Sequence, residues 1–362
     1  MCSIARYHAW MMQHINSPLQ TTAPRLFRVN ADRPLAMLRL CPAYEATPLH
    51  SLSGLAAELG IDTLWAKDET QRMRLGSFKA LGGAFAVAQM ISDAAGVADL
   101  TSPKARDTAG AMTFITASAG NHGLSVAAGA RVFGSRAVIV LSSSVPEDFA
   151  NRIRALDAEV VRVDGTYEAS VAYAIEEADA KGWLLLADGS WEGYIDRPAL
   201  VMEGYSVLAE ECRTAFANDG SWPTHVFLQA GVGGLAAAVA GHIREFWDEQ
   251  PTIVVVEPEA APCLMESVKA GCLTRADGPL SNMGRLDCKD ASLISFESLR
   301  RDADRFVTVT DAAALAAVKT LADHGVATTP SGAAPLAAIQ EFAPGMDSRC
   351  LLIVSEGSTG GE

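Results

Sequence analysis

Residues 111–141 read AMTFITASAGNHGLSVAAGARVFGSRAVIVL, and this stretch decides the fold class of the chain. Two apolar runs, AMTFIT and RAVIVL, lie on either side of the small-residue turn SAGNHG and a helix-like segment, LSVAAGARVFG. Short apolar runs bounded by turn residues are typical of buried strands, and strands that alternate with helices form parallel sheets. The stretch therefore predicts an α/β fold in which helices cover the faces of a parallel sheet.

The same alternation continues toward the C-terminus. A strand at EVVRV, a helix at YEASVAYAIEEADAKG and a strand at WLLLAD complete one block, and the strands THVFLQA, TIVVVEPE, RFVTVT and RCLLIVSEG belong to a second. We therefore predict two α/β domains with mainly parallel sheets flanked by helices. The large domain comprises residues 1–84 and 197–362, and a small inserted domain comprises residues 85–196. Two domains joined in this way are expected to form a ligand-binding cleft.

Charge and cysteine content exclude several classes of protein. The formal net charge of −14 disfavours partners such as nucleic acid or an anionic membrane, and no apolar run is long enough to span a bilayer. The seven cysteines are irregularly spaced and form no C-x-x-C pair, which predicts reduced thiols and a cytoplasmic location. The histidines show no metal-binding spacing, so we expect no metal site. A redox pair of Cys263 and Cys288 stays an alternative.

A lysine in the stretch GSFKALGG, residues 76–83, is the first candidate for chemistry. Ser77 can cap a helix, and the apolar residues after it recur at helical spacing, so Lys79 is expected on the first helical turn. The positive end of the helix dipole lowers a lysine's pKa there, and a partly neutral lysine is a nucleophile toward aldehydes. The alternative interpretation is a surface lysine on an amphipathic helix.

A glycine turn follows the strand THVFLQA. Gly231, Val232, Gly233 and Gly234 precede a helix, so their backbone N–H groups can converge on a phosphate. The turn also satisfies a dinucleotide fingerprint with Glu257 as its acidic residue, which would indicate an NAD-dependent oxidoreductase. A tight turn without a ligand is the third interpretation.

Polar side chains at the carboxyl ends of predicted strands are the remaining candidates, because ligands gather there in α/β sheets. Ser118, Asn121 and His122 lie in the turn SAGNHG and can hydrogen-bond a carboxylate or a ring hydroxyl. Asp188 ends the strand WLLLAD and can act as a general base, and Ser355 ends the last strand. Each of them is alternatively an ordinary turn residue.

Taken together, these features resemble the fold-type II pyridoxal-phosphate enzymes, the group of serine and threonine dehydratases and the tryptophan synthase β-chain. The S-F-K lysine, the S-x-G-N-H-G turn, the G-V-G-G loop and a serine ending the final strand match in order. Within that group the chain is most similar to the diaminopropionate ammonia-lyase family, through the segments ATPLHSLSGLAAELG, LWAKDE, SFKALGGAFAV, DGSWEGY, LQAGVGGLAA, VVEPEAAPCLMES and SEGST. The similarity runs from about residue 44 to residue 359.

The resemblance implies a homodimeric enzyme that uses pyridoxal 5′-phosphate for α,β-elimination on an amino-acid substrate, with L-2,3-diaminopropionate yielding pyruvate and ammonia. The alternative is a dehydratase or ammonia-lyase for a serine, threonine or 3-hydroxyaspartate-like L-amino acid. The resemblance assigns roles by motif position. For the cofactor, Lys79 forms the Schiff base, Gly231 to Gly234 hold the phosphate, Asn121 lies against the ring oxygen and Ser355 bonds the pyridine nitrogen. For the substrate, Asp188 is the base for the L-isomer, and the carboxylate is held by Ser118, Ala119, Gly120 and His122.

Two positions depart from the family pattern. The family carries an aspartate, matched to the D-isomer, where this chain has Ala119, so we expect little activity on D-substrates. The family's loop resembles M-A-G-L-A-C, whereas residues 283–288 read MGRLDC. Arg285 in this loop either reads a second acidic group on the substrate or pairs with Asp287 and faces away, and we expect the pairing.

Overall fold

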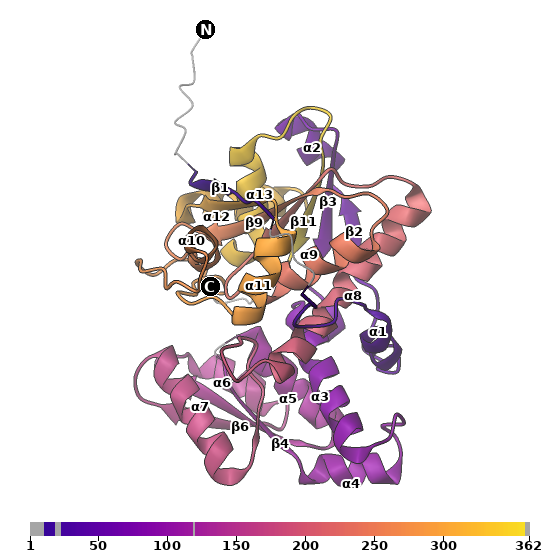
Figure 1. Cartoon of the computed structure of the whole chain (residues 1–362), viewed down its shortest axis with the longest axis vertical. Coiled ribbons are helices and arrows are strands. Elements are labelled where there is room, and N and C mark those ends of the chain that lie inside the picture. Colours follow the sequence, from indigo (N-terminus) through magenta and orange to yellow (C-terminus); the bar gives the residue numbers. More distant parts are fainter. Residues whose placement is uncertain (1–10, 19–22, 119, 359–362) are drawn as a thin grey trace. The chain divides into compact units, whose positions relative to one another are not determined.

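The computed structural model describes residues 11–18, 23–118 and 120–358. The chain divides into two compact α/β units, and Figure 1 labels most of their elements. Unit 1 comprises Met1–Pro24, Thr47–Thr70 and Glu211–Glu362, and unit 2 comprises Arg25–Ala46 and Gln71–Glu210. These boundaries differ from the expected ones, because residues 25–46, 71–84 and 197–210 belong with the smaller sheet. Both units are therefore discontinuous in sequence.

Unit 1 is built on a mainly parallel sheet. Its strands are Gln13–Ile15 (β1), Leu49–Ser51 (β2), Thr63–Asp68 (β3), His225–Gln229 (β8), Thr252–Pro258 (β9), Arg305–Val309 (β10) and Arg349–Val354 (β11). Among the described residues they form one sheet in the order β1-β10-β9-β8-β11-β3-β2. Only the edge strands β1 and β2 pair antiparallel with their neighbours, and the inner pairs are parallel.

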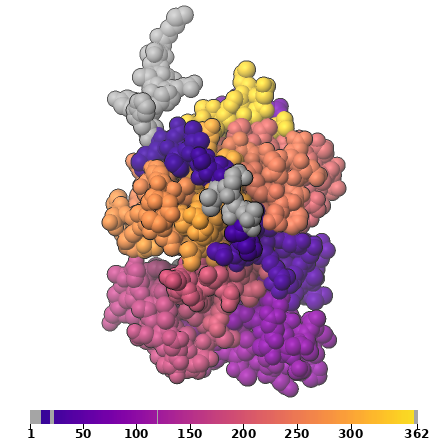
Figure 2. Space-filling model, viewed as in Figure 1, coloured from indigo at the N-terminus to yellow at the C-terminus, as the bar shows by residue number. Residues whose placement is uncertain are grey.

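Helices cover both faces of this sheet, which explains why its strands are almost continuously apolar. The helices of unit 1 are Ser53–Leu59 (α2), Gly234–Phe246 (α9), Cys263–Ala270 (α10), Leu293–Asp302 (α11), Asp311–Asp323 (α12) and Pro330–Phe342 (α13). One core joins Phe227 and Leu352 of the sheet to Leu55, Leu321 and Leu336 of α2, α12 and α13. The indigo residues of β1 lie on the orange surface of unit 1 in Figure 2, where β1 pairs with β10.

Unit 2 is built on a parallel sheet in the order β6-β5-β4-β7 among the described residues. Its elements are Asp32–Leu38 (α1), the 3₁₀ turn Arg72–Arg74 (η1), Lys79–Ala95 (α3), Pro103–Ala111 (α4), Thr113–Ala117 (β4), Asn121–Phe133 (α5), Arg136–Ser142 (β5), Glu147–Arg154 (α6), Glu159–Val163 (β6), Tyr167–Lys181 (α7) and Leu184–Leu185 (β7). A further helix, Asp196–Asp219 (α8), begins in unit 2 and ends in unit 1. Residues 113–142 thus contain β4, α5 and β5, the strand–helix–strand order that the sequence predicted.

The helix that carries Lys79 crosses two neighbouring helices at very short range. A Cβ atom built on Gly83 would lie 2.1 Å from the Ser125 hydroxyl oxygen of α5, and one built on Gly82 would lie 2.4 Å from the Tyr205 ring of α8. Only glycine fits at such contacts, because any side chain would overlap the partner helix. The two glycines of GSFKALGG therefore join α3 to unit 2. This packing is the physical reason why residues 71–84 do not belong with the large sheet.

Candidate active site

Lys79 is the first residue of α3, so its predicted position on the first helical turn is confirmed. The cap expected from the Ser77 hydroxyl is wrong, because Phe78 precedes the helix and no side chain caps that end. Backbone bonds close the turn instead: the Ala80 N–H donates to the Ser77 carbonyl at 3.2 Å, and the Leu81 N–H donates to that of Phe78 at 3.0 Å. The helix therefore starts at the amine-bearing residue itself.

Lys79 and Asp188 form an ion pair in which the Lys79 ammonium donates a hydrogen bond to Asp188 Oδ2. Asp188 follows β7, which is shorter than the strand expected over residues 183–188. The two side chains are 23% and 21% exposed, so the pair is largely enclosed yet still reached by solvent. Unit 2 thus brings together the candidate nucleophile and the candidate base.

The charge of Lys79 sets the ionisation of Asp188. Burial alone would raise the pKa of the Asp188 carboxyl. The positive charge of Lys79 and the hydrogen bond from its ammonium more than offset that effect, so the pKa lies well below its ordinary value. Asp188 is therefore a carboxylate at neutral pH, which a proton acceptor requires.

His122 is buried beside the residues that follow β7, so its ring is not exposed to a bound substrate. It is 2% exposed on the first turn of α5, and its Nε2 donates to the Leu186 carbonyl oxygen at 2.7 Å. Burial lowers the pKa of His122, so the ring is neutral at neutral pH. The ring therefore holds the backbone two residues before Asp188.

The turn between β4 and α5 is lined by small residues. Ser118 is nearly buried, and its hydroxyl oxygen accepts the Gly120 N–H at 3.2 Å. Asn121 begins α5 directly after Gly120, so the positive end of the helix dipole meets this turn, an arrangement that suits a carboxylate. Ala119 lies outside the described residues.

In unit 1 the glycine turn connects β8 to α9. Gly231, Val232 and Gly233 form the connection, and α9 begins at Gly234. Gly233 has φ of +99°, and a Cβ built there would lie 2.8 Å from Cβ of Ser295, so neither the backbone nor the space admits a side chain. The turn therefore presents bare backbone at a helix N-terminus, which fits a phosphate group.

Ser355 follows β11 directly and is 4% exposed. A nearly buried hydroxyl at this position suits a ring nitrogen that accepts a hydrogen bond. Because β11 lies beside β8 in parallel orientation, Ser355 and the glycine turn follow neighbouring strands at the same edge of the unit 1 sheet.

The pairing that we expected between Arg285 and Asp287 is wrong. The Asp287 carboxylate accepts a hydrogen bond from the Lys289 ammonium at 2.6 Å instead. Arg285 forms a looser ion pair with Glu356, with 3.8 Å between Nε and Oε2, and its side chain is 31% exposed. Since Glu356 follows Ser355, Arg285 lies at the same edge of the sheet as the candidate ring-nitrogen partner.

Two thiols lie beside the glycine turn. The buried Cys263 Sγ is 3.5 Å from the Gly231 carbonyl oxygen, and a Cβ built on Gly231 would lie 3.0 Å from Cys288 Sγ. Burial raises the pKa of the Cys263 thiol far above its usual value, so it is neutral. Neither cysteine forms a disulfide in the structure.

Glu257 does not fit the role of a nucleotide-binding acid. It is fully buried, and its two carboxylate oxygens accept the backbone N–H groups of Leu264 and Met265, each at 2.8 Å, at the start of α10. Burial raises the pKa of Glu257 to about 8, and these N–H groups act in the opposite direction. Because a ribose cannot reach an enclosed carboxylate, this arrangement removes the basis of the oxidoreductase alternative.

The sequence analysis missed one residue beside the Lys79–Asp188 pair. Tyr205 of α8 is 1% exposed, and its ring packs edge-to-face on Phe78 with 4.8 Å between centroids. No motif marks this tyrosine, because its position depends on the crossing of α3 with α8. The only signal was indirect, in the unusual Gly82–Gly83 pair.

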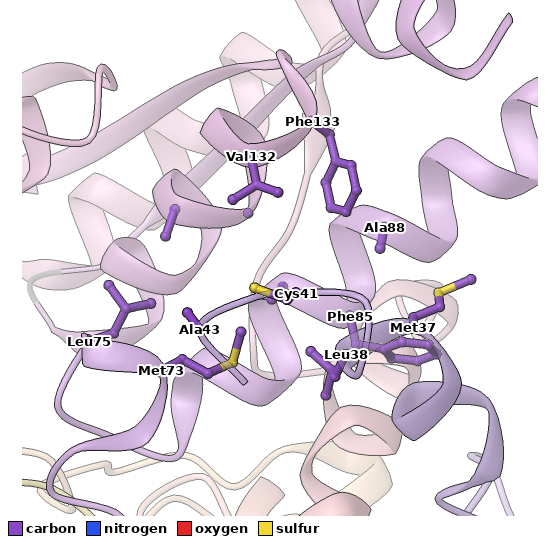
Figure 3. Close-up of a pocket in the computed structure, with 13 residues that line it drawn as sticks. Met37, Leu38, Cys41, Ala43, Met73, Leu75, Phe85, Ala88, Val132 and Phe133 are labelled. Atoms are coloured by element: carbon purple, nitrogen blue, oxygen red, sulfur yellow. The ribbon is translucent and has the colours of Figure 1, made fainter. Parts of the chain in front are cut away.

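An apolar pocket of unit 2 lies beside Ala84, Phe85 and Ala88 of α3, and Lys79 is not part of its lining (Figure 3). It encloses about 600 Å³, open solvent included, and residues of α1, η1, α3 and α5 line it, among them Met37, Met73, Phe85 and Val132. Cys41 is the one titratable residue of its lining. The pocket therefore lacks the amine and the acid that a proton-transfer site needs.

Two other kinds of site are absent from the described ranges. No cluster of three or more histidine, cysteine, aspartate or glutamate side chains could hold a metal ion there. No helix in that part of the chain has both the length and the apolar character needed to cross a membrane.

Comparison with known proteins connects this geometry to one family. The model of the pyridoxal-phosphate dependent enzyme family matches residues 40–356. Diaminopropionate ammonia-lyase of Salmonella typhimurium is 36% identical over 76% of this chain and 72% of its own length, and that of Escherichia coli is 32% identical over 87% and 85%.

A solved structure agrees with these relatives. The Escherichia coli diaminopropionate ammonia-lyase, in complex with an aminoacrylate-PLP azomethine reaction intermediate, superposes with a TM-score of 0.86 at 29% identity, over 97% of this chain and 94% of that one. The fold-type II architecture and the cofactor expected from the sequence are thereby confirmed. The chain belongs to the pyridoxal-phosphate-dependent enzyme family and, within it, to the diaminopropionate ammonia-lyase family.

Proposed function

We propose that this chain catalyses the α,β-elimination of L-2,3-diaminopropionate, with water, to pyruvate and two molecules of ammonia. The observation that carries the proposal is the Lys79–Asp188 pair, an amine and an ionised carboxylate held in contact in unit 2. The names of the relatives point to the same substrate.

Four motifs of the chain would hold pyridoxal phosphate. Lys79 would join the cofactor's aldehyde, the turn Gly231–Val232–Gly233–Gly234 would bind its phosphate, and Ser355 and Asn121 would bond its ring nitrogen and ring oxygen. The bare glycine backbone and the nearly buried Ser355 hydroxyl support this assignment. The bound cofactor supplies an electron sink for the electron pair left when the α-proton departs.

Asp188 is our candidate for the group that accepts the α-proton of the L-substrate. Its carboxylate is ionised at neutral pH, and it is enclosed enough to exclude most water. His122 would act on it indirectly, by holding the backbone at Leu186 in place. We therefore assign His122 a positioning role through its ring.

The turn before α5 would bind the substrate carboxylate. Its first helical N–H groups, together with Ser118 and Gly120, present donors and a positive dipole to an anion. Ala119 would fill the position at which the family carries an aspartate and offers no proton to a D-substrate.

The proposal is tested by comparing L- and D-2,3-diaminopropionate. We expect the purified, cofactor-loaded chain to release pyruvate and two equivalents of ammonia from the L-isomer and little from the D-isomer. The α-proton of the D-isomer lies on the opposite face of the substrate, and Ala119 has no group that can accept it. Pyruvate is followed with lactate dehydrogenase, and ammonia with glutamate dehydrogenase. Equal rates on both isomers would contradict the assignment of Ala119, and no pyruvate from either would contradict the proposed function.

A second candidate substrate class is favoured by Arg285. Its side chain is partly exposed at the edge of the sheet where Ser355 lies, so the guanidinium is placed where it could meet a second carboxylate, as in a 3-hydroxyaspartate-like amino acid. If Arg285 reads such a group, Arg285→Leu lowers kcat/KM for L-threo-3-hydroxyaspartate by about 10-fold or more and leaves that for L-serine within twofold. Keto-acid release across a panel of L-amino acids measures both, and a parallel loss on both substrates would indicate a structural role only.

We also propose that the enzyme is a homodimer in the cytoplasm. The resemblance to the family implies the dimer, and the absence of disulfides among the described cysteines fits the location. Sedimentation equilibrium of the purified chain tests the dimer, and fractionation of cells that express it tests the location.

A further inference from the structure

Tyr205 carries a buried hydroxyl that has no role in the proposed function. Its side chain is 1% exposed, and the hydroxyl has no hydrogen-bond partner among the residues that the structure describes. An orphaned buried hydroxyl has lost its water without gaining a partner, which is unfavourable unless another state of the protein supplies one.

The packing of α8 on α3 directs this ring toward Lys79. A Cβ built on Gly204 would lie 2.7 Å from Cα of Gly82, so the two helices touch backbone to backbone next to Tyr205. The Tyr205 ring occupies the space over Gly82 and packs on Phe78, and the Lys79 amine lies 5.5 Å from the centroid of that same Phe78 ring. The tyrosine is thus held against the first turn of the lysine helix.

Electrostatics agree with this placement. Burial raises the pKa of Tyr205 far above its usual value, while the positive charge of Lys79 and the approach of its amine to the phenol oxygen oppose the rise and the negative charge of Asp188 adds to it. The phenol is therefore neutral at neutral pH, and the two charged groups that act on it are the two members of the candidate catalytic pair.

We infer that Tyr205 is a positioning residue that holds the Lys79 amine whenever Asp188 does not. The inference rests on the proposed function, in which Asp188 takes a proton from the substrate and cannot bond the Lys79 amine at the same time. A hydroxyl can accept a hydrogen bond from an ammonium group and donate one to a neutral amine, whereas a carboxylate can only accept. A neutral phenol is therefore suited to keep the amine in place in both of its protonation states.

The first test is Tyr205→Phe in the cofactor-loaded full-length chain. We expect kcat for pyruvate release to fall about tenfold, the scale of losing one hydrogen bond to a charged group, while KM stays within twofold. The melting temperature of the cofactor-free chain should stay the same or rise, because the variant removes a hydroxyl that had no partner. Tyr194→Phe is the control for a hydroxyl with a purely structural role. The Tyr194 hydroxyl accepts the Ala187 N–H at 3.0 Å and donates to the Leu185 carbonyl at 2.9 Å, so its loss should lower the melting temperature.

The second test needs no activity. In the cofactor-free Asp188→Ala chain, in which no carboxylate holds the amine, the reactivity of the Lys79 amine toward acetic anhydride is measured against pH by mass spectrometry of the peptide that contains it, with and without Tyr205→Phe. Tyr205→Phe should move the midpoint to lower pH, because the phenol oxygen no longer stabilises the ammonium form. Tyr173→Phe, whose ring packs on the core of unit 2, should leave the midpoint unchanged.

These readouts separate the inference from the proposed function. An unchanged midpoint in Tyr205→Phe overturns the role of Tyr205, whatever happens to kcat, and leaves the elimination activity of the wild-type chain standing. A shifted midpoint in a chain whose wild type releases no pyruvate overturns the proposed function while keeping Tyr205 beside the amine. A shifted midpoint together with the loss of kcat supports both.

Discussion

Replacing Lys79 with alanine is expected to abolish both elimination and covalent attachment of the cofactor. The amine at the start of α3 is the group that would join the aldehyde, and a methyl side chain cannot replace it. We expect pyruvate release to fall by at least about 10³-fold, the scale of losing one member of a cooperating catalytic group. After incubation with pyridoxal phosphate and reduction with borohydride, the wild-type peptide should carry the cofactor's mass on Lys79, and the variant should carry none.

The matched control for this variant is Lys104→Ala, which removes an exposed lysine of α4 in the same unit. It should leave the labelled peptide and the rate unchanged. If the Lys79→Ala protein stays yellow and active, or if the wild-type label is found on another lysine, the account of the active site is wrong.

Replacing Asp188 with asparagine is expected to separate cofactor binding from proton transfer. The variant keeps the size of the side chain but loses the carboxylate, so pyruvate release from the L-substrate should fall about 10²- to 10⁴-fold, the usual contribution of a general base. The reduced cofactor should still be found on Lys79. Asp107→Asn changes an exposed aspartate of α4 and should have no effect. Retention of most of the L-specific rate would show that another group accepts the proton.

The same variant has a predictable effect on stability in the cofactor-free chain. Because the folded-state pKa of Asp188 lies below its unfolded value, the carboxylate contributes stability that is fully present above the unfolded pKa of about 3.9. That contribution is lost as the pH falls through the lower folded-state pKa. The difference in unfolding free energy between wild type and Asp188→Asn should therefore be largest near neutral pH and shrink in acid, which denaturant titrations at several pH values can measure.

Much of the fold was predictable because it depends on local patterns. The strand, turn and helix of residues 111–141, the first-turn position of Lys79 and the glycine turn before α9 each arise from residues that are neighbours in sequence. Apolar runs, turn residues and helical spacing report such neighbours directly.

The domain boundaries and several side-chain partners were not predictable in this way. The expected Ser77 cap failed because a backbone bond closes the turn, and the expected Arg285–Asp287 pair failed because Lys289 lies closer to Asp287. In both cases several partners were compatible with the sequence. Packing in three dimensions selected one of them.

By itself the sequence determined the α/β class, the family, and which residue types stand at strand and helix ends. Only the tertiary structure decided which of them meet. The Gly82–Gly83 crossings place α3 in unit 2, where Lys79 reaches Asp188 and Tyr205 lies against the lysine helix. Tertiary packing also buries Glu257 at the start of α10, where backbone N–H groups occupy its carboxylate and a ligand cannot reach it. The physical reason is that a contact between distant residues depends on how closely helices and sheets approach, and that distance is set by side-chain volume at the crossings, which no periodicity along the chain reports.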